Sequence, residues 1–150
     1  MEIRIQELAE AKVSGIRYCR KDELPSHKEA YFDWTAFPLI STLDSTQVTC
    51  GFLKAWHCVP EFHMIETHPD KEIFYFIKGT CLMLLCDMRD GAPDLDSAQI
   101  VRIREGTCVE IEGNKAHFVA VPDSDYYEAL VVAPVQEGPR MELPEPVLAV

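Results

Sequence analysis

The hydrophobic residues of this chain fall in short segments that are separated by turn signals. Residues 81–86 are continuously apolar, which is typical of a strand buried on both faces. Gly113-Asn114 and Pro122-Asp123 are two of the turn signals between later segments. No long segment shows hydrophobic residues at the spacing of an amphipathic helix. It therefore predicts an all-β protein, built as an antiparallel β-barrel or jelly roll with a few short helices.

We expect a single domain over residues 1–150 with its core at about 45–133. A short helix is expected at residues 6–12. The Pro-rich tail, residues 134–150, is expected to lie extended over the surface or to pack against a partner subunit. Loops are expected at residues 20–30 and 87–97. The expected strands contain residues 3–5, 46–56, 62–67, 73–77, 81–86, 100–103, 108–111, 117–121 and 126–132.

Charge and composition exclude some classes of partner. The net charge is −11 and the pI is about 4.8, and the Lys and Arg residues are scattered, which argues against nucleic acid. No apolar stretch approaches the roughly 20 residues that a membrane span needs. The first residues lack a secretory signal pattern, so we expect a cytoplasmic protein. None of the six cysteines forms a C-x-x-C pair, and we interpret them as small, buried apolar residues.

Two carboxylates and two histidines have the spacing of a metal-ligand set. Glu66 and His68 are two residues apart, so they share a face of a strand. The turn-like residues after His68 return Glu72 alongside on the next strand, and a second hairpin could deliver His117 to the same cavity. Their oxygen and nitrogen atoms suit Zn, Mn, Ni or Fe. We predict that these four residues bind a divalent metal, and that Glu66, His68 and His117 take part in acid–base catalysis.

Two further residues are candidates for substrate binding. Lys54 has the strand parity of Phe52 and Trp56, which we expect to face inward. Lys54 then either points into the cavity, where it would pair with a substrate carboxylate, or lies on the surface with its charge in water. His63 is one parity step from Glu66, so it reaches the cavity only if a bulge intervenes.

The region around these residues resembles the first motif of the cupins, G-x5-H-x-H-x3,4-E-x6-G. The run His68-x3-Glu72-x6-Gly79 matches the second half of that motif. Glu66 stands at the place of its first His, and the opening Gly is absent. The resemblance implies a cupin-type barrel with its chemistry inside the barrel mouth.

The second cupin motif, G-x5-P-x-G-x2-H-x3-N, is resembled by Gly106 and His117. A closer resemblance is to the ureidoglycolate lyase family of cupins, because residues 63–69 are similar to its H-x-x-E-x-H-P signature. That resemblance implies cleavage of a C–N bond in ureidoglycolate, which releases urea and glyoxylate in purine catabolism. The family usually has a paired His after the position of His117, where this chain has Phe118.

Three functions are consistent with these features. The resemblance favours a ureidoglycolate lyase-like enzyme. The complete four-residue set favours another metal-dependent cupin enzyme, such as an isomerase or an oxygenase, and a non-catalytic cupin that binds a small ligand is the third. We expect a small polar or anionic ligand in each case. We also expect a homodimer, because an N-terminal strand and the Pro-rich tail are available for exchange between subunits.

Overall fold

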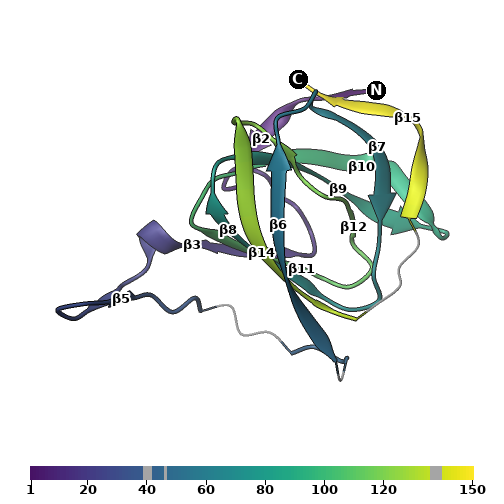
Figure 1. Ribbon diagram of the computed structural model, residues 1–150. Coiled ribbons are helices and arrows are strands. Elements are labelled where there is room, and N and C mark those ends of the chain that lie inside the picture. The colour runs from purple at the N-terminus through teal and green to yellow at the C-terminus, as the bar shows by residue number, and fades with distance from the viewer. Residues whose placement is uncertain (39–41, 46, 136–139) are drawn as a thin grey trace.

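Two facing β-sheets curve into a barrel-like body (Figure 1). The structure is a computed structural model, and it describes residues 1–38, 42–45, 47–135 and 140–150. Nearly all of its regular elements are strands, and most neighbouring strands in both sheets are antiparallel. The prediction of an all-β protein with an antiparallel barrel or jelly-roll architecture is therefore confirmed.

Strands that are far apart in the sequence are neighbours in each sheet. The first sheet has the order β1 (Glu2–Ile3), β15 (Arg140–Ala149), β7 (Glu61–Glu66), β12 (Ala116–His117), β9 (Cys81–Arg89), β10 (Ala92–Ile103) and β2 (Ile5–Glu7), and β13 (Val121–Pro122) also pairs with β9. The second has the order β3 (Ile16–Arg20), β11 (Thr107–Ile111), β8 (Glu72–Lys78), β14 (Tyr126–Pro134) and β6 (Val48–Trp56). A separate hairpin consists of β4 (His27–Lys28) and β5 (Asp33–Trp34).

The hydrophobic core lies on both faces of β9. Met83 and Leu85 pack with Phe74 and Phe76 of β8 in the cluster between the two sheets. Leu84 and its neighbours on the opposite face belong to a second cluster, which β7, β10 and β15 complete. Residues 81–86 are all buried, which confirms the prediction of a strand buried on both faces. Each large side chain buried here stabilises the fold by about 1.5–3 kcal/mol.

Helical structure is scarce, and the helix predicted at residues 6–12 is wrong. Ile5–Glu7 form β2 and pair in parallel with β10, and the Leu8 N–H donates to the Arg102 carbonyl at 3.3 Å. This pairing competes with a helix for the same backbone groups, so only a turn follows. The 3-10 helix η1 (Lys21–Glu23) is the helical element of the described residues. No helix among the described residues is long and apolar enough to cross a membrane.

Two segments expected as loops or tail form strands instead. β9 and β10 continue through residues 87–97 as a hairpin, because Asp90 and Gly91 take the positive φ values of 53° and 80° that a tight turn between strands requires. Most of the Pro-rich tail forms β15, which pairs with β7. Its residues 136–139, like residue 46 of the strand expected at 46–56, lie outside the described residues.

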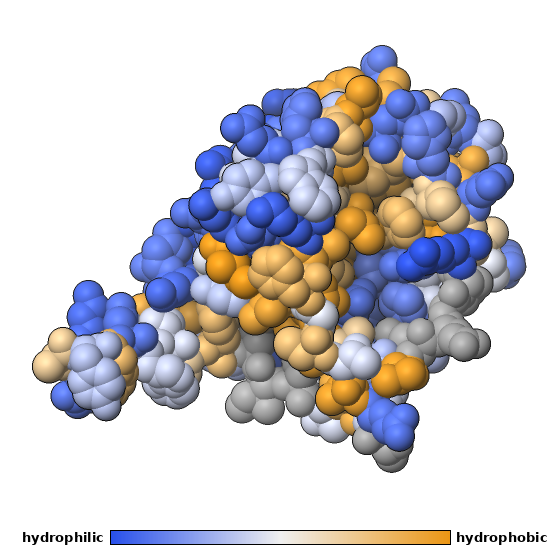
Figure 2. All heavy atoms as spheres, viewed as in Figure 1, coloured by the Kyte–Doolittle hydropathy of each residue, from blue (hydrophilic) through white to orange (hydrophobic). Residues whose placement is uncertain are grey.

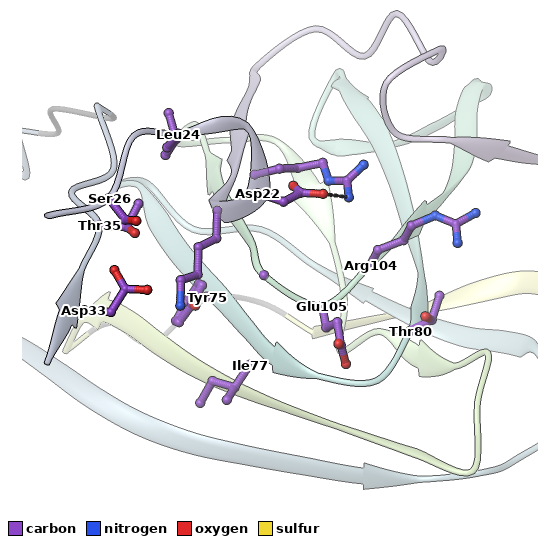
Figure 3. A pocket seen from close by; sticks show the side chains of 13 residues that line it. Asp22, Leu24, Ser26, Asp33, Thr35, Tyr75, Ile77, Thr80, Arg104 and Glu105 are labelled. Carbon is purple, nitrogen blue, oxygen red and sulfur yellow. Dashed lines mark hydrogen bonds and ion pairs between the residues drawn. The ribbon is translucent and has the colours of Figure 1, made fainter. Parts of the chain in front are cut away.

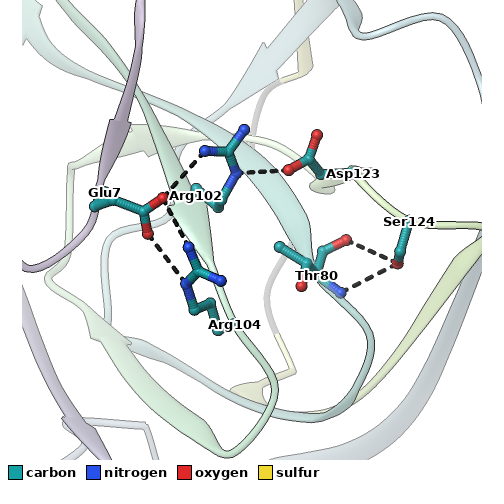
Figure 4. A network of polar contacts seen from close by, with 6 residues as sticks. All are labelled: Glu7, Thr80, Arg102, Arg104, Asp123 and Ser124. Carbon is teal, nitrogen blue, oxygen red and sulfur yellow. Dashed lines mark hydrogen bonds and ion pairs between the residues drawn. The ribbon is translucent and has the colours of Figure 1, made fainter.

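A network of charged side chains lies at the end of the first sheet where β2 pairs with β10 (Figure 4). Glu7 of β2 accepts hydrogen bonds from Arg102 Nη1 and Arg104 Nη2, each at 3.0 Å. Arg102 also donates through Nε to Asp123. Nearby, the Thr80 N–H donates to the Ser124 hydroxyl at 3.1 Å. The network therefore joins β2, β10 and the segment before β14.

The β4–β5 hairpin projects from the barrel as an arm (Figure 1). Tyr31 at its tip is 90% exposed and Trp34 is 62% exposed. Between this arm and the end of β8 lies an open cleft of about 710 Å³ (Figure 3). Tyr75 and several charged side chains, among them Arg104 and Glu105, line it. Aromatic residues thus lie on a projection that contacts little of its own barrel.

Candidate functional site

The structure brings Glu66, His68, Glu72 and His117 together. Glu66 ends β7, Glu72 begins β8, and His68 lies in the turn between them. His117 lies on β12, directly opposite Glu66 in the pairing with β7. All four side chains are 13% exposed or less, so they form one largely buried cluster. Their catalytic and metal-binding roles stay predictions.

The turn that carries His68 is held from two sides. The Asn114 N–H donates to the His68 carbonyl at 2.6 Å, and Asn114 takes a positive φ of 63° to do so. On the other side, the Asp70 carboxylate accepts hydrogen bonds from the backbone N–H and hydroxyl of Ser45, both at 2.9 Å. These bonds fix the backbone that carries the His68 side chain.

Hydrogen bonds hold His117 at both ring nitrogens. Its Nδ1 lies 2.9 Å from the Lys115 carbonyl, which can only accept, so Nδ1 carries a proton. Its Nε2 lies 2.7 Å from Oε2 of Glu72. A contact this short between an imidazole nitrogen and a carboxylate oxygen requires a proton between them. Glu72 and His117 are therefore a hydrogen-bonded carboxylate–imidazole pair inside the cluster.

His68 faces two carboxylates at distances longer than hydrogen bonds. Its Nε2 lies 3.8 Å from Glu66 Oε1 and 3.9 Å from Glu72 Oε2. The nearby Glu66 carboxylate is the main cause of a raised pKa at His68, with burial opposing it and Glu72 adding to it. The pKa of Glu66 is lowered, first by His68 and also by Arg140, against the opposing effect of burial. Opposite charges thus stabilise each other within the cluster.

These residues fit a divalent cation. One donor atom from each of Glu66, His68 and His117 lies within 4.8 Å of the others, so one ion could contact all three. Nδ1 of His68 is buried without a hydrogen-bond partner among the described residues, and its Nε2 is not hydrogen-bonded to either carboxylate. Imidazole and carboxylate donors are the mixed set that Zn, Mn, Ni and Fe accept.

The two predicted substrate-binding residues lie outside this cluster. Lys54 is on the outer face of β6, where its Nζ pairs with Glu128 at 2.9 Å. The expected parity of β6 is wrong, because Phe52 and Trp56 are exposed and the alternate residues, Leu53 and Ala55, pack against the core. His63 is largely exposed and lies 3.6 Å from Glu61.

An apolar pocket of about 370 Å³ adjoins the cluster. It lies between β6, β7 and residues 118–122, where hydrophobic side chains line a hollow on the face shown in Figure 2. His63 is at its edge, and the apolar residues that line it include Trp56, Phe62, Met64, Phe118 and Val121. Phe118 connects it to the cluster, because this residue directly follows His117.

Sequence reasoning missed Arg140. This residue begins β15 and lies opposite Glu66 in the pairing with β7. Its Nε donates to Oε2 of Glu66 at 3.0 Å, and its guanidinium carbon lies 5.8 Å from the centre of the Phe118 ring. No sequence signal could have found it, since the contact depends on a strand register between segments 74 residues apart.

The cysteines take no part in the cluster. Cys19, Cys81, Cys86 and Cys108 are free and buried, and burial raises the pKa of Cys86 and Cys108 to about 11. They behave as the small apolar residues that we predicted. Cys50 is exposed, as is Cys58, so the prediction is wrong for these two.

Comparison with known proteins identifies the fold. No family model matches the sequence, and no curated protein matches it. Among solved structures, RmlC from Streptococcus suis in complex with dTDP-D-xylose matches with a TM-score of 0.57 and 13% identity, over 83% of this chain and 66% of that one. dTDP-6-deoxy-D-glucose-3,5-epimerase RmlC from Legionella pneumophila matches with a TM-score of 0.59 and 10% identity, over 85% of this chain and 71% of that one.

A third solved structure is matched over a larger share of its own length. The dTDP sugar isomerase from Desulfovibrio desulfuricans matches with a TM-score of 0.53 and 14% identity, over 88% of this chain and 85% of that one. This chain spans about two thirds of the Streptococcus suis protein. At such low identity the likeness shows the fold, and it gives no support to ureidoglycolate lyase activity. The chain therefore has the cupin-type β-barrel fold.

Proposed function

We propose that this protein is a metal-dependent enzyme of the isomerase kind, which moves a proton on a small polar substrate that contains a carbonyl group. The observation that carries the proposal is the convergence of two histidines and two carboxylates, with Oε2 of Glu72 2.7 Å from Nε2 of His117. Buried titratable groups in one cluster are costly to keep without a function. The fold shared with sugar epimerases and an isomerase is consistent with this reaction class.

The side chains divide into two roles. Glu66, His68 and His117 would hold the cation, because one donor atom of each lies within 4.8 Å of the others. Glu72 carries the transferred proton. Its Oε2 lies 2.7 Å from Nε2 of His117, and if that nitrogen holds a cation in place of a proton, the Glu72 carboxylate is free to accept one from the substrate. When bound, the cation supplies positive charge that stabilises negative charge developing on a substrate oxygen. Burial of the cluster excludes most water and strengthens these interactions.

Metal binding tests the first role. Isothermal titration of the protein with Zn²⁺, Mn²⁺, Ni²⁺ and Fe²⁺, together with elemental analysis, should find one ion per chain. His68→Ala and His117→Ala should each weaken binding by at least about 100-fold, since loss of a partner of a ligand alone costs about 10- to 100-fold. His63→Ala is the matched control and should bind as the wild type does. A wild type that binds no metal, or an equal loss in His63→Ala, would contradict the role.

Isotope exchange tests the second role. In D₂O, a dTDP-4-keto-6-deoxy sugar should gain deuterium at the carbon next to its carbonyl, as followed by NMR. Glu72→Gln should slow this exchange by about 100-fold or more, the contribution expected of a general base. Ureidoglycolate is the second substrate to assay, because Glu66 and His68 of the lyase-like segment both lie in the cluster. If urea and glyoxylate appear and no exchange does, the lyase function holds and the isomerase proposal is wrong.

We also propose that the protein is a homodimer. The N-terminal strand β1 pairs with β15 of its own chain, and β15 pairs with β7. Within one chain both segments are thus paired, and the proposal rests on another surface. The outer face of β6 and β14 supports the dimer instead, because Phe52 there is 63% exposed and Leu130 is 36% exposed.

A further inference from the structure

Arg140 lies where the polar cluster and the apolar pocket meet. Its side chain is 65% exposed, whereas its partner Glu66 is 13% exposed. The hydrogen bond to Glu66 uses Nε, and the rest of the guanidinium carries further N–H donors in a rigid fork. The position of its guanidinium carbon near the Phe118 ring places the same charge beside the apolar pocket. The Arg140 guanidinium thus lies beside both the polar cluster and the apolar pocket.

The pocket is sized for an apolar group and offers it little polar contact. Its volume is about 370 Å³, which is at the lower end of the range of small-molecule sites. Phe62 and Met64 of β7 form one wall, and Met64 is two residues before Glu66 on that strand. A ligand bound among these side chains therefore has its other end close to Glu66 and Arg140.

From this arrangement we infer that Arg140 anchors an anionic group of the substrate, while an apolar group of ring size occupies the pocket beside Phe118. The substrate is then amphipathic, with its reacting part held at the cluster between these two contacts. Arginine suits this task because its fork matches the two oxygens of a carboxylate. The inference rests on the proposed function, because only an enzyme has a substrate. Binding of a ligand at this site can nevertheless be tested without metal.

Two probes of one shape and different charge test the inference. Indole-3-acetate carries the anionic and ring-sized groups, and indole-3-acetamide is its neutral counterpart. Binding to the metal-free protein should be measured by NMR titration, with the backbone signals of Met64 and Phe118 reporting the site. Indole-3-acetate should bind at least about 10-fold more tightly than the amide, as a charge-assisted contact predicts.

Variants identify the anchor. Arg140→Ala should abolish the preference for the anion, and Arg140→Lys should restore only part of it because lysine lacks the fork. Arg89→Ala is the matched control, since Arg89 is also exposed, at 67%, and paired with a carboxylate, that of Asp94. Phe118→Ala should weaken both probes. An Arg140→Ala protein that keeps the preference, or probe signals that appear away from Met64 and Phe118, would overturn the inference.

The outcome is separable from that of the proposed function. If the wild type binds no metal but Arg140→Ala loses the anion preference, the proposed function fails and the anchor stands. If the wild type binds metal and Arg140→Ala leaves the preference unchanged, the anchor is wrong and the proposed function stands. Circular dichroism of each variant confirms that the loss of binding is not a loss of folding.

Discussion

At the scale of single residues, Gly113 keeps the two halves of the candidate site in contact. A Cβ at this position would lie 2.4 Å from the Pro69 carbonyl oxygen and 3.0 Å from its carbon. Pro69 directly follows His68, and Asn114, which directly follows Gly113, hydrogen-bonds the His68 carbonyl. The close approach of two backbones, which glycine alone permits, therefore sets where the His68 ring lies.

We expect Gly113→Ala to weaken both folding and metal binding. The added methyl group would push the Pro69 turn away, so the free energy of unfolding should fall by about 1–3 kcal/mol, the usual cost of overpacking. The metal dissociation constant should rise, because His68 moves with the turn. Chemical denaturation and calorimetric titration measure the two effects. Gly51→Ala is the control, since its Cβ would meet nothing closer than 4.0 Å, and equal results for both variants would contradict the argument.

Much of the candidate cluster could be predicted because it is encoded locally. Glu66, His68 and Glu72 lie within one strand-turn-strand unit, so spacing alone places them together. To place His117 in the same cluster, the prediction needed only one further hairpin. Arg140 and the apolar pocket could not be predicted, since they depend on which distant strands pair and in which register.

At the scale of elements, hydrophobic residues marked most strands between residues 46 and 132, but they missed β3 and β15 and did not always show which face is buried. In β6 the large apolar residues Phe52 and Trp56 face out, so periodicity without the fold could not separate the core from an exposed apolar face. The hairpin through residues 87–97 was missed for the opposite reason. Its polar residues are typical of a loop, yet strand pairing satisfies their backbone groups.

The contact between β2 and β10 makes stability depend on pH. Arg104 is the main group that lowers the pKa of Glu7, and Arg102 adds to it. A carboxylate with a lowered pKa in the folded state stabilises the fold fully above its unfolded-state pKa of about 4.3. This stabilisation is lost as the pH falls through the pKa of the folded state. Glu7→Gln should therefore lower stability at pH 7 by less than about 1 kcal/mol, because the pair is partly exposed.

As the pH falls below about 4.3 and then through the lowered pKa of Glu7, Glu7→Gln and the wild type should converge in stability. Urea denaturation at a series of pH values measures the difference. Glu10→Gln serves as the control, because Glu10 is exposed and makes no ion pair with a described residue. A difference between Glu7→Gln and the wild type that stays constant from pH 7 to pH 3 would show that the charge of Glu7 is not the cause.

At the scale of the whole molecule, β6 leaves an edge of its sheet open. It pairs with β14 on one side and ends the strand order on the other. Its outer face carries exposed apolar side chains, and the aromatic arm formed by β4 and β5 projects from the same barrel (Figure 1). A long apolar edge strand is a site where another chain adds. A second copy that covers this face would bury it with two-fold symmetry.

We expect static light scattering to give the mass of a dimer at micromolar concentration. Phe52→Glu should shift the protein toward monomer by placing a charge in the interface, without loss of secondary structure by circular dichroism. Val150→Glu is the control, since Val150 is similarly exposed, at 56%, but its backbone hydrogen-bonds Ile3 and Ile5 and is not part of the β6–β14 face. A monomeric wild type, or a dimer unchanged in Phe52→Glu, would exclude this interface.

The position of β7 between β12 and β15 has a consequence for synthesis on the ribosome. Glu66 emerges early, but β15, which pairs with its strand, is translated 74 residues later. Until β15 is made, the edge of β7 that faces it has no native partner, and the apolar residues of β7 stay accessible to chaperones or to other nascent chains. Pairings this distant in sequence also fold slowly, because the loop must close before contacts form. The chemistry of the barrel mouth is therefore among the last features that a newly made chain acquires.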